Sequence, residues 1–208
     1  MARILITSGP TREYLDPIRF ISNESSGRMG QAMAAAALEQ GHEVTVVTGP
    51  VAITYPLAAT VVDVITTADL EREVQALYPS FDGIIAAAAP CDFRPRHPAD
   101  RKIKKTGSGI AIEFRETDDV LKKVSCNKGA NQWSVGFALE TDNGIPNAQK
   151  KLREKNLDLI VLNGPEAMNS GSNSIRILSS ERVEAEYSGS KPEVARHLLG
   201  LITRNLAG

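Results

Sequence analysis

Arg3-Ile4-Leu5-Ile6-Thr7 is the stretch that decides the fold, because this short apolar run predicts a buried β-strand at the start of the chain. About twenty residues rich in Gly, Ser, Asn and Arg separate it from the apolar run at residues 33–38, where we expect a helix. An ordinary dinucleotide-binding fold has a tight G-x-G-x-x-G turn at this point. A loop this long inside a compact domain is typically functional or disordered. Its residue types hold anions through backbone N–H groups and guanidinium groups, so an anion-binding loop and a mobile surface insertion are the two interpretations.

Strand-like runs alternate with helical patterns along most of the remaining chain. We expect strands at residues 43–48, 60–65, 83–89, 110–114, 133–138 and 157–162, and helices at 27–40, 68–78 and 146–155. Two further strands at 174–178 and 182–187 predict an antiparallel hairpin at the sheet edge, followed by a closing helix at 192–206. The pattern predicts an α/β fold with a Rossmann-like, mainly parallel sheet and helices on both faces.

Composition bounds the class of protein. A chain of 208 residues with 42% hydrophobic and 24% charged residues is typical of one soluble globular domain, and we expect a single domain over residues 1–208. The net charge of −1 creates no general field that favours nucleic acid or an anionic membrane. Cys91 and Cys126 are too few for a disulfide framework or a metal knuckle, and they indicate a reducing cytoplasm. No signal peptide or apolar run of about 20 residues is present, which fits a cytoplasmic protein.

Two groups of basic residues are candidate anion sites. The run Arg101-Lys102-Ile103-Lys104-Lys105 lies in a loop close in sequence to Asp92, which follows a predicted buried strand. The lysines could neutralise a triphosphate while the carboxylate holds a metal ion or ribose hydroxyls, although such runs are often solvated surface. Lys151 and Lys155 share one helical face. Phe137 is a candidate for stacking on a base, and its alternative is a place in the core.

The histidines are scattered, and the motifs of serine hydrolases, zinc proteases and dithiol enzymes are absent from the sequence. Covalent catalysis by serine or cysteine is therefore not indicated.

Five motifs occur in the order found in one known family. They are the opening segments Ile6–Glu13 with Asp16–Arg19, then Ile21–Gly30, Lys102–Lys105, Val135–Thr141 and Lys151–Asn163. Together they resemble the bacterial phosphopantothenoylcysteine synthetases (phosphopantothenate–cysteine ligases), the second half of the bifunctional coenzyme A biosynthesis flavoprotein. The segment Ile21-Ser22-Asn23-Glu24-Ser25-Ser26-Gly27-Arg28-Met29-Gly30 is the most specific of the set. The resemblance spans nearly the whole chain, and the flavin-dependent decarboxylase half is absent from it.

The resemblance implies a ligase with two half-reactions. CTP first activates the carboxylate of 4'-phosphopantothenate as an acyl-cytidylate, with Mg²⁺ bridging phosphates, and cysteine then forms the amide and releases CMP. A homodimer is implied, and a separate phosphopantothenoylcysteine decarboxylase is a possible partner. Small molecules are the expected ligands, with no nucleic acid and no membrane.

Residue by residue, the resemblance implies three groups of site residues. Asn23, Lys102 and Arg19 match catalytic positions. Nucleotide binding is implied for Gly9, Ala86, Ala87, Ala88, Asp92, Lys102, Phe137, Lys151 and Lys155. Substrate binding is implied for Arg19, Asn23, Ser25, Ser26 and Gly27, and Asp92 is the candidate metal ligand.

The chain departs from the family pattern at Pro90-Cys91 and at Thr117-Asp118-Asp119, which replaces the usual N-P-D of a nucleotide contact. Two alternatives to the ligase remain at this point. One is an NAD(P)-dependent oxidoreductase, which the absence of G-x-G-x-x-G and Tyr-x-x-x-Lys disfavours. The other is a nucleotide-binding module without catalytic activity.

Overall fold

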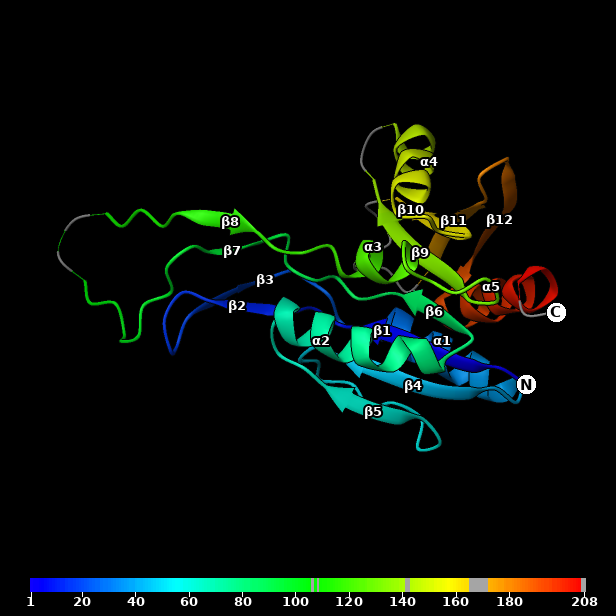
Figure 1. Ribbon diagram of the computed structural model, residues 1–208, viewed down its shortest axis with the longest axis horizontal. Coiled ribbons are helices and arrows are strands. Elements are labelled where there is room, and N and C mark those ends of the chain that lie inside the picture. Colours follow the sequence, from blue (N-terminus) through cyan, green and yellow to red (C-terminus); the bar gives the residue numbers. More distant parts are fainter. Residues whose placement is uncertain (106, 108, 141–142, 165–171, 207–208) are drawn as a thin grey trace.

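A central sheet of eight strands forms the body of the molecule (Figure 1). The computed structural model describes residues 1–105, 107, 109–140, 143–164 and 172–206. The strand order across the sheet is β12-β11-β10-β9-β6-β1-β4-β5. The parallel strands are β1 (Arg3–Ser8), β4 (Glu43–Thr48), β5 (Thr60–Asp63), β6 (Gly83–Ala86), β9 (Trp133–Leu139) and β10 (Leu159–Asn163).

The edge of the sheet beyond β10 is antiparallel. It consists of β11 (Ser172–Leu178) and β12 (Val183–Ser190), which pair with each other and, through β11, with β10. The predicted edge hairpin and the predicted mainly parallel α/β sheet are therefore confirmed.

Helices cover both faces of the sheet. On one face lie α1 (Arg28–Glu39) and α5 (Lys191–Asn205), and on the other lie α2 (Thr67–Leu77), α3 (Val120–Ser125) and α4 (Gly144–Glu154), with a short 3-10 turn, η1, at Tyr78–Ser80. This arrangement explains why β1 is apolar at every central position. Ile4 and Ile6 pack with Met33 of α1, whereas Leu5 faces the opposite side and packs with Leu70 of α2. Among the described helices, none is long and apolar enough to cross a membrane.

The prediction of a strand at residues 110–114 is wrong except at Phe114. Phe114 begins a short strand, β8 (Phe114–Glu116), which pairs with β7 (Phe93–Pro95) in a sheet of its own. A second pair, β2 (Arg12–Tyr14) with β3 (Phe20–Ser22), lies within the long loop after β1. The alternation at 110–114 is therefore not the signature of a strand in the central sheet. It belongs to a connection that leaves the sheet.

These two hairpins form what we call the arm, comprising residues 12–22 and the described residues of 93–116. The two pairs of strands extend away from the body of the molecule beside each other (Figure 1), and β2 contacts β7. The long loop after β1 thus contains a hairpin formed by β2 and β3. Its position puts the residues that follow β3 at the carboxyl end of the central strands.

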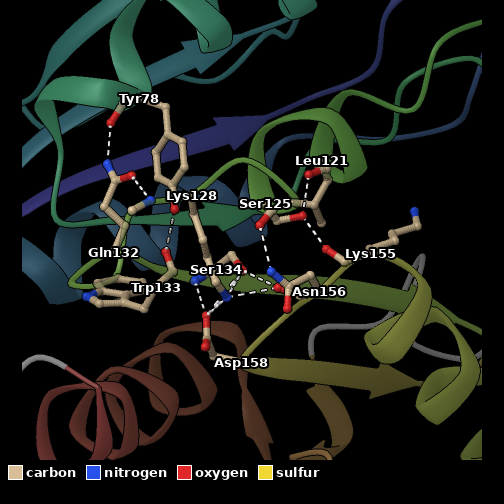
Figure 2. A network of polar contacts seen from close by, with 11 residues as sticks. Tyr78, Leu121, Ser125, Lys128, Gln132, Trp133, Ser134, Lys155, Asn156 and Asp158 are labelled. Carbon is tan, nitrogen blue, oxygen red and sulfur yellow. Dashed lines mark hydrogen bonds and ion pairs between the residues drawn. The ribbon is translucent and has the colours of Figure 1, made fainter.

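A polar network braces the opposite end of the sheet, where β9 and β10 begin (Figure 2). The Asp158 carboxylate accepts hydrogen bonds from Lys128 Nζ at 2.5 Å and from the Ser134 backbone N–H at 2.7 Å. Asn156 Nδ2 donates to the Ser125 carbonyl at 3.1 Å, which ties the end of α3 to the turn before β10. Trp133 is buried beside this network, and a Cβ on Gly83 would come within 2.1 Å of its ring.

Candidate functional site

A cleft with a volume of about 670 Å³ opens at the carboxyl ends of the parallel strands. Thr7 of β1, Ala86 of β6, Leu139 of β9 and Asn163 of β10 line it. Open α/β sheets bind their ligands at this end of the strands. The predicted site residues that line the cleft are Asn23, Ser25, Ser26, Gly27, Ala86, Ala87, Ala88, Asp92, Phe137, Lys151 and Lys155.

Asn23 lies in the loop between β3 and α1 and reaches across to the loop that follows β6. Its Nδ2 donates to the Pro90 carbonyl at 2.9 Å and to the Ala89 carbonyl at 3.4 Å. The side chain is exposed, and its amide group is held at the edge of the cleft by these two contacts. An amide held in this way presents hydrogen-bond donors in a fixed direction and is not itself a nucleophile.

Two glycines allow α1 to begin against the end of β1. Gly27 is the N-cap residue and has a φ of 73°, where a Cβ would come within 2.9 Å of Val51 Cγ1. A Cβ on Gly30 would come within 2.2 Å of Ser8 Oγ. Because Gly27 has no side chain to cap the helix, the N–H groups of the first turn are suited to an anion in the cleft.

The departure from the family pattern at Pro90-Cys91 lies where the loop after β6 meets the base of the arm. Cys91 is buried, and its backbone N–H donates to Thr11 Oγ1 at 2.8 Å while its carbonyl accepts from Thr117 Oγ1 at 2.6 Å. Burial raises the pKa of the Cys91 thiol, which keeps it neutral. The residue fastens the loop after β6 to the base of the arm, and Asp92 still lines the cleft.

Lys151 of α4 and Lys155, the C-cap residue of α4, line the cleft and each form an ion pair with a carboxylate. Lys151 Nζ lies 2.6 Å from Glu140 Oε1, and this hydrogen bond lowers the pKa of Glu140. Lys155 Nζ lies 2.8 Å from Asp119 Oδ2, and the Asp119 side chain also caps α3. An ammonium group has three N–H donors, so a lysine paired with one carboxylate can still bind a ligand oxygen.

Phe137 and the alanines that follow β6 line the cleft with apolar side chains. Phe137 lines the cleft and is also partly buried against the main hydrophobic core, so its packing in the core is confirmed and its stacking on a base stays a prediction. The N–H groups of Ala87 and Ala88 donate to the carbonyl and the hydroxyl of Thr7, at 3.0 and 3.3 Å. These contacts fix the chain where it leaves β6.

Three predicted site residues are not among the described residues that line the cleft: Gly9, Arg19 and Lys102. Gly9 follows β1 with a φ of 71°, and its carbonyl accepts a hydrogen bond from the Ala89 N–H at 2.9 Å. Arg19 and Lys102 belong to the arm, where Arg19 Nη1 lies 3.0 Å from Asp16 Oδ2. Their functional roles stay predictions.

Sequence reasoning also missed residues of the cleft. Besides the strand-end residues Thr7, Leu139 and Asn163, they include Arg28, Met29, Glu116 and Lys191. Thr117, Asp118 and Asp119, where the sequence departs from the family pattern, also line the cleft. The position of Asn163 directly after an apolar run was a usable signal. Lys191 comes from the start of α5, and nothing in the local sequence connects it with the cleft.

No group of three or more His, Cys, Asp or Glu side chains is placed to hold a metal ion in the part of the chain that the structure describes. The predicted contact of Asp92 with a metal ion therefore stays a prediction that rests on a single carboxylate.

Comparison with known proteins places this chain in a family. The chain matches the family described as the DNA/pantothenate metabolism flavoprotein C-terminal domain over residues 1–206. It is 42% identical over 169 residues to the coenzyme A biosynthesis bifunctional protein CoaBC of Bacillus subtilis (strain 168), a match that covers 81% of this chain and 41% of that protein. It is also 42% identical over 204 residues to a cysteine/cysteine sulfinic acid decarboxylase of an unknown prokaryotic organism, covering 95% of this chain and 56% of that protein.

Solved structures agree with these matches. The crystal structure of the C-terminal domain of the coenzyme A biosynthesis bifunctional protein CoaBC is similar with a TM-score of 0.85 and 39% sequence identity. That match covers 99% of this chain and 95% of the other. The chain spans about half the length of the curated relatives it matches. These findings confirm the resemblance that the sequence motifs indicated: the chain belongs to the family of DNA/pantothenate metabolism flavoprotein C-terminal domains, the family of the synthetase domain of CoaBC.

Proposed function

We propose that this chain forms 4'-phosphopantothenoylcysteine from 4'-phosphopantothenate and L-cysteine, with CTP as the activating nucleotide, in coenzyme A biosynthesis. The observation that carries this proposal is the cleft itself. It brings Asn23, the loop at residues 25–27 and the lysines of α4 together at the carboxyl ends of the parallel strands. Membership of the family of the CoaBC C-terminal domain supplies the substrate class.

The proposed reaction has two steps. A carboxylate oxygen of phosphopantothenate attacks the α-phosphorus of CTP, and the bond to the β-phosphate breaks, so pyrophosphate leaves and an acyl-cytidylate remains. The cysteine amine then attacks the acyl carbon, CMP leaves with the bonding electron pair, and the amine proton passes to solvent. Both steps develop negative charge on oxygen, which fixed N–H donors and cations stabilise.

The side chains of the cleft suit these steps. The Asn23 amide, now donating to the Pro90 carbonyl, can turn one N–H toward an acyl oxygen and act as one donor of an oxyanion hole. The start of α1 offers N–H groups to phosphate oxygens. Lys102 and Arg19 are proposed to meet the triphosphate and the substrate from the arm.

At the nucleotide end we propose contacts from Gly9, residues 86–88, Asp92, Phe137, Lys151 and Lys155. We expect Mg²⁺ to arrive on the triphosphate and to neutralise part of its charge, a mode that needs few direct protein ligands. No group of three or more His, Cys, Asp or Glu side chains among the described residues is placed for a metal ion, which fits that mode better than an all-protein metal site. We also propose that a phosphopantothenoylcysteine decarboxylase consumes the product.

Pyrophosphate release tests the proposed function. We expect release only when CTP and phosphopantothenate are both present, and the amide product, detected by mass spectrometry, only after L-cysteine is added. CTP binding without pyrophosphate release would favour a non-catalytic nucleotide-binding module. Binding of a nicotinamide cofactor in place of CTP would favour the oxidoreductase.

CTP should be used at least about tenfold better than ATP in kcat/KM, a difference of about 1.4 kcal/mol in transition-state binding. The reason is the bacterial form of the loop motif, Met29-Gly30, together with Lys151 and Lys155, which line the cleft and resemble the family's lysines at the base of the nucleotide. Initial rates of pyrophosphate release at limiting concentrations of each nucleotide measure the ratio. Equal rates, or faster use of ATP, would contradict the prediction.

The arm favours a homodimer. It exposes several large apolar side chains, among them Ile18, Phe20, Phe93, Phe114 and Ile110, the last with 64% of its surface exposed. A second copy of the chain would cover such a surface, because projecting apolar side chains are costly in water. This placement would also bring the basic loop of the arm close to a subunit boundary.

We expect sedimentation at micromolar concentration to give about twice the chain mass of 22.4 kDa. Ile110→Asp should shift the population toward monomer because it puts a charge on the covered surface. Leu57→Asp is the matched control, since Leu57 is fully exposed and lies outside the arm. A monomeric wild-type protein with full activity would rule out the dimer.

A further inference from the structure

We propose that Asp16 is a positioning residue, whose buried carboxylate fastens the basic loop of the arm at Ile103 and so sets the place of Lys102. This inference deepens the proposed ligase function, and its kinetic part rests on that function. Neither Asp16 nor Ile103 is among the residues that the sequence motifs assign to substrate or nucleotide.

The Asp16 carboxylate has four hydrogen-bond donors around it. Oδ1 accepts from the backbone N–H groups of Ile18 and Arg19, each at 2.9 Å. Oδ2 accepts from Arg19 Nη1 at 3.0 Å and from the Ile103 N–H at 3.1 Å. The side chain has no exposed surface, so these contacts replace water completely.

The backbone N–H and the backbone carbonyl of Ile103 are both hydrogen-bonded. Its N–H donates to Asp16, and its carbonyl accepts from Arg19 Nη1 at 3.1 Å. A further bond joins the Ala99 N–H to the Leu15 carbonyl at 2.9 Å. Residues 99–103 are therefore attached to the turn between β2 and β3 at two points, and the Lys102 backbone lies between them.

The charge balance explains why this carboxylate can be buried. Burial alone would raise the pKa of Asp16, but the N–H donors of Ile18, Ile103 and Arg19 and the Arg19 charge outweigh it and hold the pKa below its usual range. A carboxyl group whose pKa is lower in the folded state stabilises that state at pH values above its unfolded pKa. That contribution is lost as the pH falls through the folded pKa, so the attachment is intact at neutral pH.

The alternative is that Asp16 stabilises only the local turn. If Asp16 had only that role, its loss would lower the free energy of unfolding of the protein but would not selectively open residues 99–103. The peptide bond between Lys102 and Ile103 separates the two cases, because its N–H is the group that Asp16 holds. Trypsin cleaves after lysine, and cleavage needs that segment to open locally.

In the first experiment, trypsin digestion of the full chain is followed by mass spectrometry. Asp16→Asn should raise cleavage after Lys102, relative to cleavage after Lys105, by about tenfold, since a charged acceptor of this N–H is lost. Asp158→Asn is the matched control, because Asp158 also accepts a backbone N–H and a lysine, but at the opposite end of the sheet (Figure 2). Its cleavage ratio should equal that of the wild type.

The second experiment is a double-mutant cycle with Lys102→Gln. Asp16→Asn should lower kcat/KM for CTP about tenfold in the presence of Lys102, and by less than about twofold in the Lys102→Gln background. Additive losses would overturn the inference, since they would mean that Asp16 does not act through Lys102. A Lys102→Gln variant with wild-type kinetics would overturn it as well.

The two experiments distinguish failure of the proposed function from failure of the Asp16 attachment. If the wild type releases no pyrophosphate, the proposed function falls, and the cleavage ratio still decides whether Asp16 holds the loop. If Asp16→Asn does not fold, amide hydrogen exchange of the wild type takes its place. The Ile103 amide should then exchange at least about tenfold more slowly than that of Lys105, and equal rates would overturn the attachment.

Discussion

Asn23→Asp is expected to lower the rate of amide formation about a hundredfold, because loss of one fixed donor to a developing oxyanion costs about 3 kcal/mol. The contacts of Asn23 add a second reason. Its Nδ2 faces the carbonyl oxygens of Pro90 and Ala89, so an aspartate there would set a carboxylate against two acceptors. The aspartate side chain would make neither of these hydrogen bonds and would bring a negative charge into the cleft.

The variant should keep its affinity for CTP, since the effect falls on the chemistry after nucleotide binding. Incubation with CTP, Mg²⁺ and phosphopantothenate, with pyrophosphate, acyl-cytidylate and amide followed separately, shows which half-reaction is slowed. Accumulated acyl-cytidylate would assign Asn23 to the second step.

Asn127→Asp is the matched control for this substitution. The Asn127 Nδ2 also donates to a backbone carbonyl, that of Lys123 at 2.7 Å, and Asn127 is not among the described residues of the cleft. Wild-type amide formation by Asn23→Asp would remove Asn23 from the mechanism. Loss of CTP binding would place it at the nucleotide instead.

Lys102→Gln should lower kcat/KM for CTP by about a hundredfold, the usual size of the loss when a group that stabilises phosphoryl charge is removed. Lys102 is exposed and lies in the basic loop, so thermal unfolding should change little, because exposed charges contribute at most about 1 kcal/mol to stability. Rates of pyrophosphate release and a melting curve measure the two effects.

Lys150→Gln controls for the loss of one positive charge. Its side chain is 69% exposed on α4 and forms an ion pair with Glu154, on the helix that also carries Lys151 and Lys155. Near-normal turnover by Lys102→Gln would mean that the basic run is solvated surface, which is the alternative that the sequence left open.

The central sheet could be predicted because its strands are buried on both faces. A strand such as β1 needs apolar residues at every central position, and this requirement is visible in the local sequence. The arm could not be predicted in the same way. Its strands have three residues each, and β7 pairs with β8 across a long connection rich in lysine and arginine.

The cleft was predictable where its residues lie at or just after the carboxyl ends of central strands, as Ala86–Ala88 and Phe137 do. It was not predictable where a tertiary contact makes the site. The pairing of Lys155 with Asp119 joins the end of α4 to the start of α3, and the sequence spacing of the two residues does not reveal it. In the sequence, Cys91 was visible only as a departure from the family pattern. In the structure, its backbone N–H and carbonyl bind Thr11 and Thr117, on two other loops.

The position of Trp133 determines which optical signal can follow this protein. It is the only tryptophan of the chain, it is 3% exposed, and it lies where β9 begins. The cleft opens toward the other end of the same strand, where its lining residue Phe137 lies about 13 Å from Trp133 at about 3.3 Å per residue. We therefore expect indole emission to report unfolding of the sheet and to change little when a ligand enters the cleft. Titrations of nucleotide and substrate need a calorimetric or labelled readout.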